Sequence, residues 1–525
     1  MTIKSIFFNL ISNIKIEVTP LTISFGAISI LLTAVWYWAR DEAPYAGFPI
    51  VGKENWEWLN TMAKMRFVNN ARSILRKGLE DHQGPFQVFS THGPVIILPP
   101  SMIDEIRNDD RLSFLKATGT LFMPRFSGLE AFHTEYDTHR IFLAVIKQSL
   151  TQSLASIVPD MAKGTYAMLN DLFPTTTKDW MPIHLAPLTP LIAARLSAKV
   201  FVGEPLCRDS DWLNISVTYT INAMRAILQM RQWPSFLRPL VQYFLPEFGV
   251  IRTQIRMARR LIEPELTRRQ KMEEHGEKLQ QQRSRPADAL DWMNLQARGM
   301  PFDKVLAQML MSFVAIHTTS NTLLALMYDI VSHMELIEPL RQEVVEALRE
   351  EGGWTKAALH KMKLLDSCMK ESQRLHPMSA ILMDRQVTSP VTLSDGTLLP
   401  KNAIIGVPTF SMSAPDSSFF GANPCEFDGR RFLDRRKDND IKWQFVATSS
   451  EHYGFGHGKQ ACPGRFFASN EIKIIVAHML LMFDWKFAEG EEPKSVSLVE
   501  SDFVPDEGQR IWARPRVPEV NLKEL

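Results

Sequence analysis

The pattern of hydrophobic and polar positions predicts a mainly α-helical chain. From about residue 100 to about residue 375, apolar residues recur mostly at helical spacing. Within this region the segment 302–334 is long, apolar and free of internal proline or glycine, and Pro301 precedes it. These features predict a buried helix that crosses the core. A last helix is predicted from Pro463 to about Phe483.

Two other segments predict a smaller β part. "FQVFSTHGPVIILPP" (86–100) predicts two strands about a turn at 92–94, because residues that favour strands flank His-Gly-Pro. "VTSPVTLSDGTLLPKNAIIGVP" (387–408) alternates and turns at Asp395-Gly396, which predicts a small sheet. The expected fold class is therefore mainly α with a minor β part.

Length and composition favour one large intracellular core. The 525 residues contain no low-complexity linker, no internal repeat and no abrupt change of composition. A net charge of +1 gives no reason to expect nucleic acid as a partner. The four cysteines lie far apart and form none of the close pairs of metal fingers, so a reducing compartment fits better than a disulfide framework.

The N-terminal stretch "TPLTISFGAISILLTAVWYW" (19–38) predicts a membrane anchor. It carries no charge and has about the 20 residues needed to cross a hydrocarbon core of ~30 Å. A cleaved secretory signal is the alternative, but the run is longer than a typical signal core and ends in bulky aromatics. We expect an N-terminal transmembrane anchor over 1–40, a Pro/Gly hinge over 41–55 and one folded domain over 56–525.

The segment "FGHGKQACPGRFFA" (455–468) carries the main candidate chemistry. Gly456 and Gly458 allow positive φ and a close approach to a flat partner, on whose face Phe455 can pack. Pro463 suits the first helical position, which would place Cys462 at the N-cap, where free amides favour a thiolate. A lone thiolate cannot complete a zinc site, but it can be the sole protein ligand of a porphyrin iron. For a bare Cys-Pro-Gly, the alternative is an ordinary buried cysteine.

The full spacing of Phe, two glycines, Cys and Pro-Gly resembles the haem-binding loop of the cytochrome P450 family. The resemblance implies a cytochrome P450 fold that binds haem b (iron protoporphyrin IX), with Cys462 as the axial thiolate of the iron. It also implies cofactor contacts for Phe455, Gly456 and Gly458. The family commonly has His or Arg two residues before the cysteine, where this chain has Gln460. Lys459 is the candidate to supply the missing charge for a haem propionate.

Two further motifs match structural parts of the same family. "KESQRL" contains Glu371 and Arg374, and "FDGRRF" contains Arg431; the resemblance implies that these three form a buried triad behind the haem. Gly429 and Arg430 depart from the usual Pro and Glu. Because buried ionic groups must hydrogen-bond one another, the triad is expected to be structural and not catalytic.

The predicted core helix carries "FVAIHTTSNT", which resembles the family segment over the distal face of the haem. Ala315 matches the small residue that leaves room for O2, and Thr318 matches the threonine that orders water and passes protons. His317 replaces the usual acid. With an unperturbed pKa of about 6.5, a histidine can relay protons, or it can be a satisfied helix histidine without such a role.

Cations for the haem propionates are also predicted from the resemblance. Arg385 lies where the family has an arginine that reaches one propionate. Lys147 resembles the counterpart of an arginine on an earlier helix, although Leu143 stands where a tryptophan is frequent. Either residue could instead be a surface charge.

The resemblance implies a monooxygenase that inserts one oxygen atom from O2 into a lipophilic small molecule. "AIHTTS" resembles filamentous-fungal members that act on terpenoids and related secondary metabolites. Because the chain has neither a GxGxxG nor a P-loop motif, its electrons are expected from outside. The resemblance implies that they come from NADPH through NADPH-cytochrome P450 reductase, docked near Lys442, Lys459 and Arg465. Lys442 could instead be a solvated surface charge. The expected location is the endoplasmic reticulum membrane, single-pass, with the catalytic domain on the cytosolic face.

Three alternatives or additions stay open from the sequence. A haem-thiolate isomerase or dehydratase would need no reductase, and a non-catalytic haem sensor or carrier would keep Cys462 without turnover. The loop 233–248, "WPSFLRPLVQYFLPEF", exposes aromatics between prolines and is a candidate second contact with the lipid bilayer. Substrate-lining segments are expected around 121–132, 378–383 and the core helix at Met311 and Phe313, which are apolar enough to line a cavity, although such stripes are more often plain core.

Overall fold

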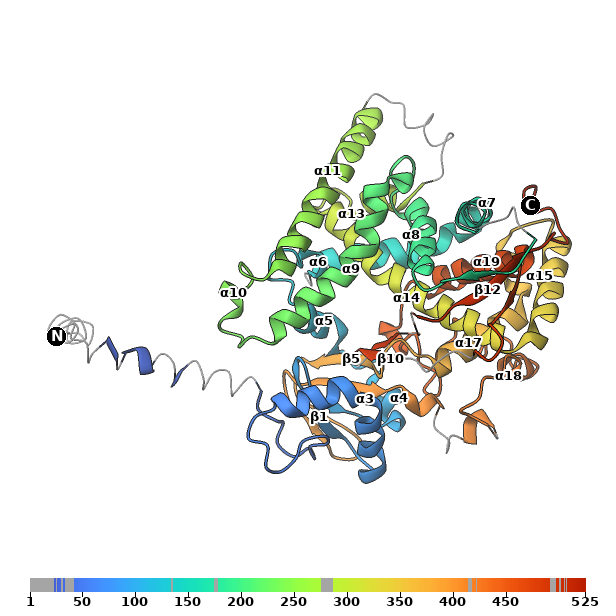
Figure 1. The fold of residues 1–525 in the computed structure, drawn as a ribbon. Helices are drawn as coiled ribbons and strands as arrows, with labels where there is room; N and C mark the ends of the chain where they lie inside the picture. The colour runs from blue at the N-terminus through green and yellow to red at the C-terminus, as the bar shows by residue number, and fades with distance from the viewer. Residues whose placement is uncertain are drawn as a thin grey trace.

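The computed structural model describes most of the chain outside its N-terminus. The described residues are 23–24, 26–29, 32–33, 42–133, 136–173, 178–274, 287–413, 418–421, 423–491, 497–499, 502–504, 506 and 508–525. Most of the predicted anchor (1–40) therefore lies outside them, and its described parts are helical and exposed. The body is a large helical part above a smaller β part, as the sequence pattern predicts (Figure 1).

The helical part is built from helices of very different length. They are α5 (Phe114–Phe122), α6 (Tyr136–Ala144), α7 (Thr151–Leu172), α8 (Leu188–Phe201), α9 (Ser210–Arg231), α10 (Arg238–Val241), α11 (Pro246–Glu274), α13 (Ala289–Ala297), α14 (Lys304–Ser332), α15 (Ile337–Glu351), α16 (Lys356–Lys361), α17 (Lys363–Leu375), α18 (Arg431–Arg435) and α19 (Arg465–Met482). A π-helical segment, Val145–Leu150, joins α6 to α7. Two more helices, α3 (Thr61–Asp81) and α4 (Ile103–Ile106), lie beside the β part (Figure 1).

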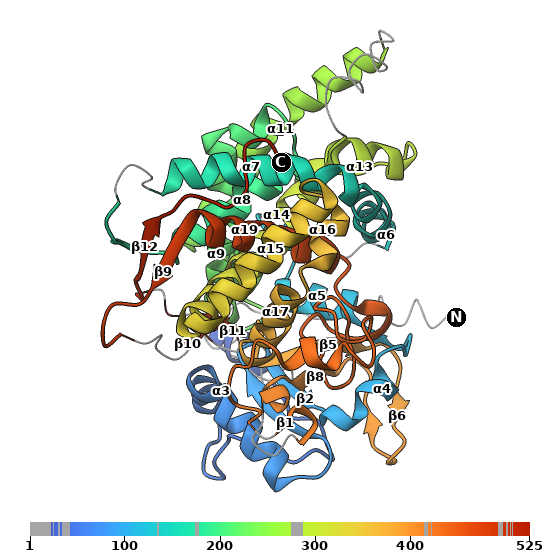
Figure 2. The same ribbon diagram turned by 90° about the vertical axis from the view of Figure 1, so that its right-hand side faces the viewer.

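Helix α14 is the predicted core helix and lies at the centre of the body. It begins after Asp303, whose side chain caps it by accepting from the Leu306 amide at 3.0 Å. It packs against α8, α9, α17 and α19, and Figure 2 shows α14 between the upper helices and α17. By length and composition α14 and the stretch Thr138–Leu172 could each cross a membrane, but their most apolar windows are 56% and 44% buried in the body.

The described strands form several small sheets and, in the β part, one five-stranded sheet (Figure 1). Its order is β1-β2-β8-β5-β3, formed by β1 (Phe86–Ser90), β2 (Gly93–Ile97), β8 (Ile404–Pro408), β5 (Ile381–Val387) and β3 (Leu112–Ser113). A three-stranded sheet contains β4 (Met181–Ile183), β12 (Ile511–Pro515) and β9 (Phe483–Lys486), and two ribbons pair β6 (Val391–Thr392) with β7 (Leu398–Leu399) and β10 (Ser497–Val499) with β11 (Asp502–Val504).

The prediction of one small sheet over 387–408 is partly wrong. Only β6 and β7 pair locally about Asp395-Gly396. The fully buried strand β8 instead pairs in parallel with β2 and antiparallel with β5. A strand buried on both faces needs neighbours on both edges. Here one of these neighbours, β2, comes from the N-terminal part of the chain, far from β8 in sequence. The hairpin β1–β2 is as predicted, with its turn at Thr91-His92 because Gly93 and Pro94 already belong to β2.

Candidate active site

Cys462 lies in a turn just before α19, not at the helix N-cap. The helix begins at Arg465 and its N-cap is Gly464, so the prediction of Pro463 at the first helical position is wrong. The reason is local: Gly464 has ψ of 0°, and Pro463-Gly464 form a turn before the helical hydrogen bonds start. The Cys462 amide donates to the Phe455 carbonyl at 2.8 Å, which closes the loop that holds the cysteine.

Two opposing effects act on the Cys462 thiol. Burial raises its pKa, while hydrogen bonds from the Gly464 and Arg465 amides and the charge of Arg465 lower it, and the net shift is upward. The amides at the start of α19 therefore lower the pKa of Cys462, as predicted. In the protein alone this effect is smaller than the cost of burying a thiolate. The side chain is still accessible, so the sulfur is free to bind a partner.

The two glycines of the loop adopt the predicted positive φ, of 68° at Gly456 and 81° at Gly458. A Cβ at Gly458 would lie 2.5 Å from the Arg107 carbonyl oxygen. Gly458 is therefore required by a close approach to the protein segment after α4. Phe455 packs edge-on against Phe445, with 4.9 Å between ring centroids, which fixes the start of the loop.

Arg385 provides an independent sign that an anion belongs in this site. It lies on β5, its residue is 2% exposed and its guanidinium is over the Phe114 ring at 5.6 Å. Its Nε has no hydrogen-bond partner among the described residues, and burial lowers its pKa to about 10. A buried guanidinium with a free donor fits an external carboxylate, such as a haem propionate.

The other predicted propionate contacts border one cavity of about 250 Å³. Lys147, Lys459 and Gln460 line it together with Phe114, the ring under Arg385. Lys459 forms an ion pair with Asp110. Gln460 is fully used by the protein, since its amide donates to the Leu112 carbonyl at 2.9 Å and accepts from the Phe114 amide at 2.7 Å. Lys147 is thus the lysine in this cavity without an ion pair among the described residues.

Helix α14 exposes a short stripe in an otherwise buried element. Val314 is 42% exposed, Thr318 is also exposed one turn later, and Ala315 beside them is half-buried. The Thr318 hydroxyl donates to the Val314 carbonyl at 2.8 Å. An exposed threonine in the middle of the core helix fits a position that faces a bound group or substrate.

His317 points away from this stripe and contacts α9. Its Nε2 donates to the Val217 carbonyl at 2.8 Å. Burial lowers the pKa of His317, with a smaller upward effect from this hydrogen bond. The ring is therefore neutral near pH 7 and ties α14 to α9, the arrangement of a histidine satisfied by helix packing.

Comparison with known proteins decides the family. A sequence profile described as cytochrome P450 matches residues 55–506. The chain is 39% identical to the cytochrome P450 monooxygenase ntnM of a Nectria species over 82% of this chain and 81% of ntnM, and 37% identical to hepE of Aspergillus oryzae over 88% and 85%. The chain belongs to the cytochrome P450 family.

The fold of this P450 agrees with a solved structure of the family. The retinoic acid-bound cyanobacterial CYP120A1 superposes with a TM-score of 0.65 over 90% of this chain and all of that one, at 19% identity. The P450 is thus a monooxygenase with haem b as cofactor. The residues fit that group, because an accessible cysteine thiol and a buried arginine with an unpaired Nε lie in the loop and strand that the family uses.

The predicted triad of the P450 is assembled as expected. Arg374 Nη2 and Nε donate to the two carboxylate oxygens of Glu371 at 2.7 and 2.8 Å, and Arg431 Nε donates to Glu371 at 2.9 Å. Glu371 and Arg374 are fully buried. At Gly429, where the family has proline, a Cβ would lie 2.8 Å from the Cys368 sulfur. This P450 therefore packs a cysteine and a glycine where a larger residue would clash.

Arg465 has a role that sequence reasoning missed. Its Nη1 donates to the Cys462 carbonyl at 2.7 Å and its Nε to the Val446 carbonyl at 3.1 Å. It was predicted as a docking cation, but its guanidinium bonds within the cysteine loop. The available signal was its place three residues after the cysteine, at the start of a helix.

Glu471 was also missed. It is fully buried on α19, where Ser197 Oγ donates to it at 2.9 Å. A lone acid in the apolar run "EIKIIVAHMLLM" was the signal in the sequence.

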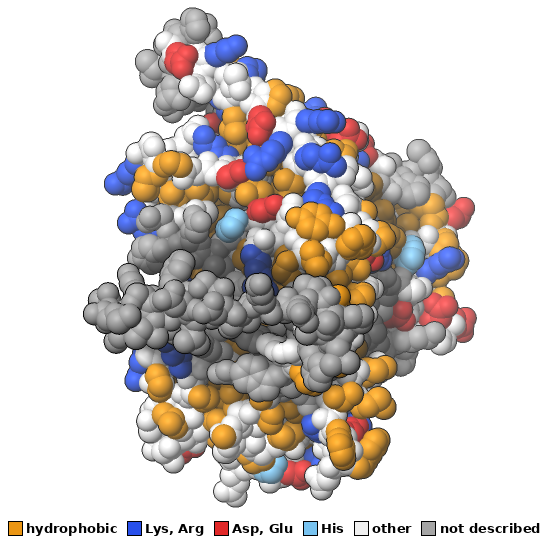
Figure 3. All heavy atoms as spheres, turned by 90° about the vertical axis from the view of Figure 1, so that its left-hand side faces the viewer, with side chains coloured by type: hydrophobic (Ala, Val, Ile, Leu, Met, Phe, Trp, Pro, Cys, Tyr) orange, Lys and Arg blue, Asp and Glu red, His pale blue; other side chains and the backbone are white. Residues whose placement is uncertain are grey.

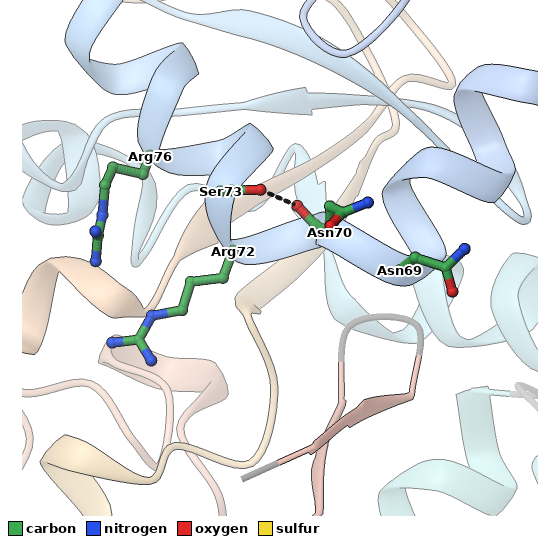
Figure 4. Close-up of a pocket in the computed structure, with 5 residues that line it drawn as sticks. All are labelled: Asn69, Asn70, Arg72, Ser73 and Arg76. Carbon is green, nitrogen blue, oxygen red and sulfur yellow. Dashed lines mark hydrogen bonds between the residues drawn. The ribbon is translucent and has the colours of Figure 1, made fainter. Parts of the chain in front are cut away.

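A second hollow, of about 520 Å³, lies away from these groups. It is lined by Asn69, Asn70, Arg72, Ser73 and Arg76 of α3, and Figure 4 shows the two arginines on one side of the helix. None of the predicted site residues borders it. The cavity of about 250 Å³ is therefore the one of these two that predicted site residues border.

Proposed function

We propose that this P450 is a membrane-anchored monooxygenase that oxidises a lipophilic terpenoid or related secondary metabolite with electrons from NADPH. The observation that carries the proposal is that the chain has both Cys462 in the turn before α19 and a buried Arg385 whose Nε has no hydrogen-bond partner among the described residues. When bound, a thiolate-ligated haem activates O2, so that one oxygen atom enters the substrate and the other leaves as water.

We assign one task to each site residue. Cys462 Sγ binds the iron, and Phe455, Gly456 and Gly458 shape the loop that presents it. Arg385 and Lys147 bind the propionates, a task supported by the free Nε of Arg385 and the absence of an ion pair at Lys147 among the described residues. Thr318 orders water and passes protons toward the reacting centre, and Ala315 leaves room beside it.

An aromatic cluster supports a lipophilic substrate. The ring of Phe313 on α14 packs against the rings of Phe132 and Phe122, with 4.6 and 5.6 Å between ring centroids. Both partners belong to the segment predicted to line the pocket. The rings bring α5 and α14 together next to the exposed stripe of Val314 and Thr318. Such a wall binds apolar molecules. The terpenoid class rests on the resemblance of "AIHTTS" to fungal members.

Electron supply from NADPH-cytochrome P450 reductase rests on the absence of a nucleotide motif and on surface charge. Lys442 is exposed and its Nζ lies 4.8 Å from the centroid of the Trp443 ring. Lys459 is on that loop but paired with Asp110, and Arg465 is committed to carbonyls. We therefore assign the main docking charge for an acidic partner to Lys442.

Membrane attachment is proposed through the anchor and the segment 233–245. The last three residues of the predicted loop 233–248 belong to α11, and Phe248 is buried there. Trp233, Phe236 and Phe244 are 42%, 41% and 83% exposed, and α10 within this segment lies on the same side of the body as the described residues among 23–33 (Figure 1). Figure 3 views that side, and hydrophobic side chains are exposed over its upper and lower parts. Exposed apolar groups on one side of a protein suit a bilayer surface, here of the endoplasmic reticulum.

The reaction is tested with purified full-length protein and candidate terpenoids. A ferrous-carbonyl band typical of thiolate ligation is expected, and its loss in Cys462→Ser. Product should form only with NADPH and reductase. Product without reductase would favour an isomerase or dehydratase, and a correct spectrum without product from any substrate would favour a sensor or carrier.

Membrane contact is tested separately with an anchor-deleted form. Replacing Trp233 and Phe236 with Ser should reduce its partition into vesicles. Each substitution removes apolar side-chain surface that would otherwise leave water when the protein binds the membrane. Ile441→Ser removes an exposed apolar residue elsewhere on the surface and is the matched control. Unchanged partition of the double variant would refute the contact.

A further inference from the structure

Glu471 is an unpaired carboxyl at the meeting point of three helices. Its residue is 0% exposed. Ser197 of α8 donates to its Oε1 at 2.9 Å, whereas Oε2 has no hydrogen-bond partner among the described residues. The Thr319 hydroxyl of α14 is close enough to favour the ionised carboxyl, but without the geometry of a full hydrogen bond. A fully buried polar group with one empty position calls for a role.

The surroundings keep this carboxyl neutral. Burial raises the pKa of Glu471 to about 8, against smaller downward effects of Ser197 and Thr319. No charged group of α8, α14 or α19 acts on it among the described residues. The nearest lysine along α19, Lys473, is bound to Asp366 at 2.7 Å. Glu471 is thus a carboxylic acid that carries its own proton at neutral pH.

Its position links the two sides of the haem site. Glu471 is on α19, the helix that follows Cys462, and it faces Thr319, the neighbour of Thr318 on α14. Within the described residues α14 carries one acid, Asp329, which bonds to His376 three turns away. His317 is tied to α9. Glu471 therefore meets α14 at Thr319, next to Thr318.

We propose that Glu471 is a positioning residue: its buried carboxyl, held by Ser197 and facing Thr319, fixes the turn of α14 that presents Thr318. The proposal rests on the proposed monooxygenase function. A carboxyl that stays protonated can bridge two hydroxyl-bearing helices without an unpaired charge. Once ionised, the same group would be an uncompensated buried anion and would push against this turn.

The protonation state is tested without turnover. Infrared spectra of the full-length holoprotein near pH 7 should contain a protonated carboxylic-acid band that Glu471→Gln removes and Ser197→Ala shifts. Glu471→Gln keeps the shape and neutrality of the acid, so haem content and the ferrous-carbonyl band should stay unchanged. A carboxylic-acid band that survives unchanged in Glu471→Gln would overturn the proposal.

The positioning role is tested by coupling, measured as hydrogen peroxide released per NADPH consumed with reductase. Glu471→Leu should raise this ratio by at least about three-fold, because small displacements of site groups are costly to a reaction. Glu471→Gln should stay near wild type at pH 7 and, unlike wild type, keep its coupling above pH 8. If Glu471→Leu does not fold, the pH comparison of Glu471→Gln with wild type decides.

Equal loss of coupling above pH 8 in wild type and Glu471→Gln would contradict the proposal. Failure of the proposed function has a different signature, which is the absence of a thiolate-type carbonyl band in the wild-type protein. The infrared result stands in either case, because it reports the carboxyl itself.

Discussion

Arg465 donates a hydrogen bond from Nη1 to the carbonyl oxygen of Cys462 at 2.7 Å, and from Nε to the Val446 carbonyl at 3.1 Å. One guanidinium therefore ties the cysteine turn to the segment that precedes the loop. Such charged hydrogen bonds each contribute roughly 1.5–3 kcal/mol. The arginine is the first residue of α19, and its charge also lowers the pKa of the Cys462 thiol.

We expect Arg465→Gln to loosen the cysteine turn. Loss of both hydrogen bonds should weaken haem retention about ten-fold, which corresponds to about 1.4 kcal/mol. Arg465→Lys should be intermediate, because an ammonium keeps the charge but not the fork of donors. Haem transfer to an acceptor protein and the ferrous-carbonyl spectrum measure the effect. Lys437→Gln removes an exposed charge and is the control; equal haem loss in both variants would contradict the role of Arg465.

The two interpretations of His317 predict different effects of the same two substitutions. If His317 only ties α14 to α9 through Val217, then His317→Gln keeps a donor and should retain near wild-type activity, while His317→Leu should lose about 1 kcal/mol of stability. If the ring relays protons, both variants should lose coupling alike. Thermal unfolding and peroxide released per NADPH separate the outcomes. We expect His317→Gln to keep near wild-type activity, because burial already holds the pKa of His317 below its usual value and so disfavours a proton relay.

Much of the site could be predicted because it depends on local spacing. Residues close together in sequence specify three of its parts: the cysteine loop, the core helix 302–334 and the Glu-x-x-Arg pair. The positive φ of Gly456 and Gly458 follows from their chemistry in the same way. Arg431 joins the pair from another segment, and it was found only through the family resemblance.

What could not be predicted depends on contacts between distant segments. The amide of Gln460 bonds to Leu112 and Phe114, so it is not free for a propionate. The place of β8 beside β2 and the contact of Glu471 with Ser197 join residues far apart in sequence. The late start of α19 was missed for another reason: a proline-glycine pair allows a turn as readily as a first helical turn.

The buried triad should be sensitive to loss of either arginine. Arg431→Gln removes a partner of the fully buried Glu371 and leaves part of its charge uncompensated. We expect a loss of about 3–5 kcal/mol in the free energy of unfolding, with loss of haem. Urea unfolding followed by tryptophan fluorescence measures it. Arg430→Gln changes the exposed neighbour and is the matched control; equal midpoints for the two variants would refute a structural triad.

Lys370 should make the stability of this P450 depend on pH above neutrality. It is 1% exposed, its Nζ donates to the Gln444 and Ala447 carbonyls, and burial lowers its pKa to about 7. In the unfolded chain a lysine has a pKa of about 10.4. Between these values the unfolded chain binds the extra proton, so the free energy of unfolding should rise with pH by up to about 1.4 kcal/mol per pH unit.

Lys370→Met should remove this rise, because the variant has no group that protonates on unfolding. Below pH 7 both states of the wild-type lysine are charged, so the slope from this residue should vanish there. Unfolding midpoints at pH 6.5, 7.5 and 8.5 of the full-length holoprotein test the sign. Lys442→Met, at an exposed lysine beside the same segment, should keep the wild-type slope. Parallel curves for wild type and Lys370→Met above pH 7 would mean that the buried amine keeps its proton in the folded protein.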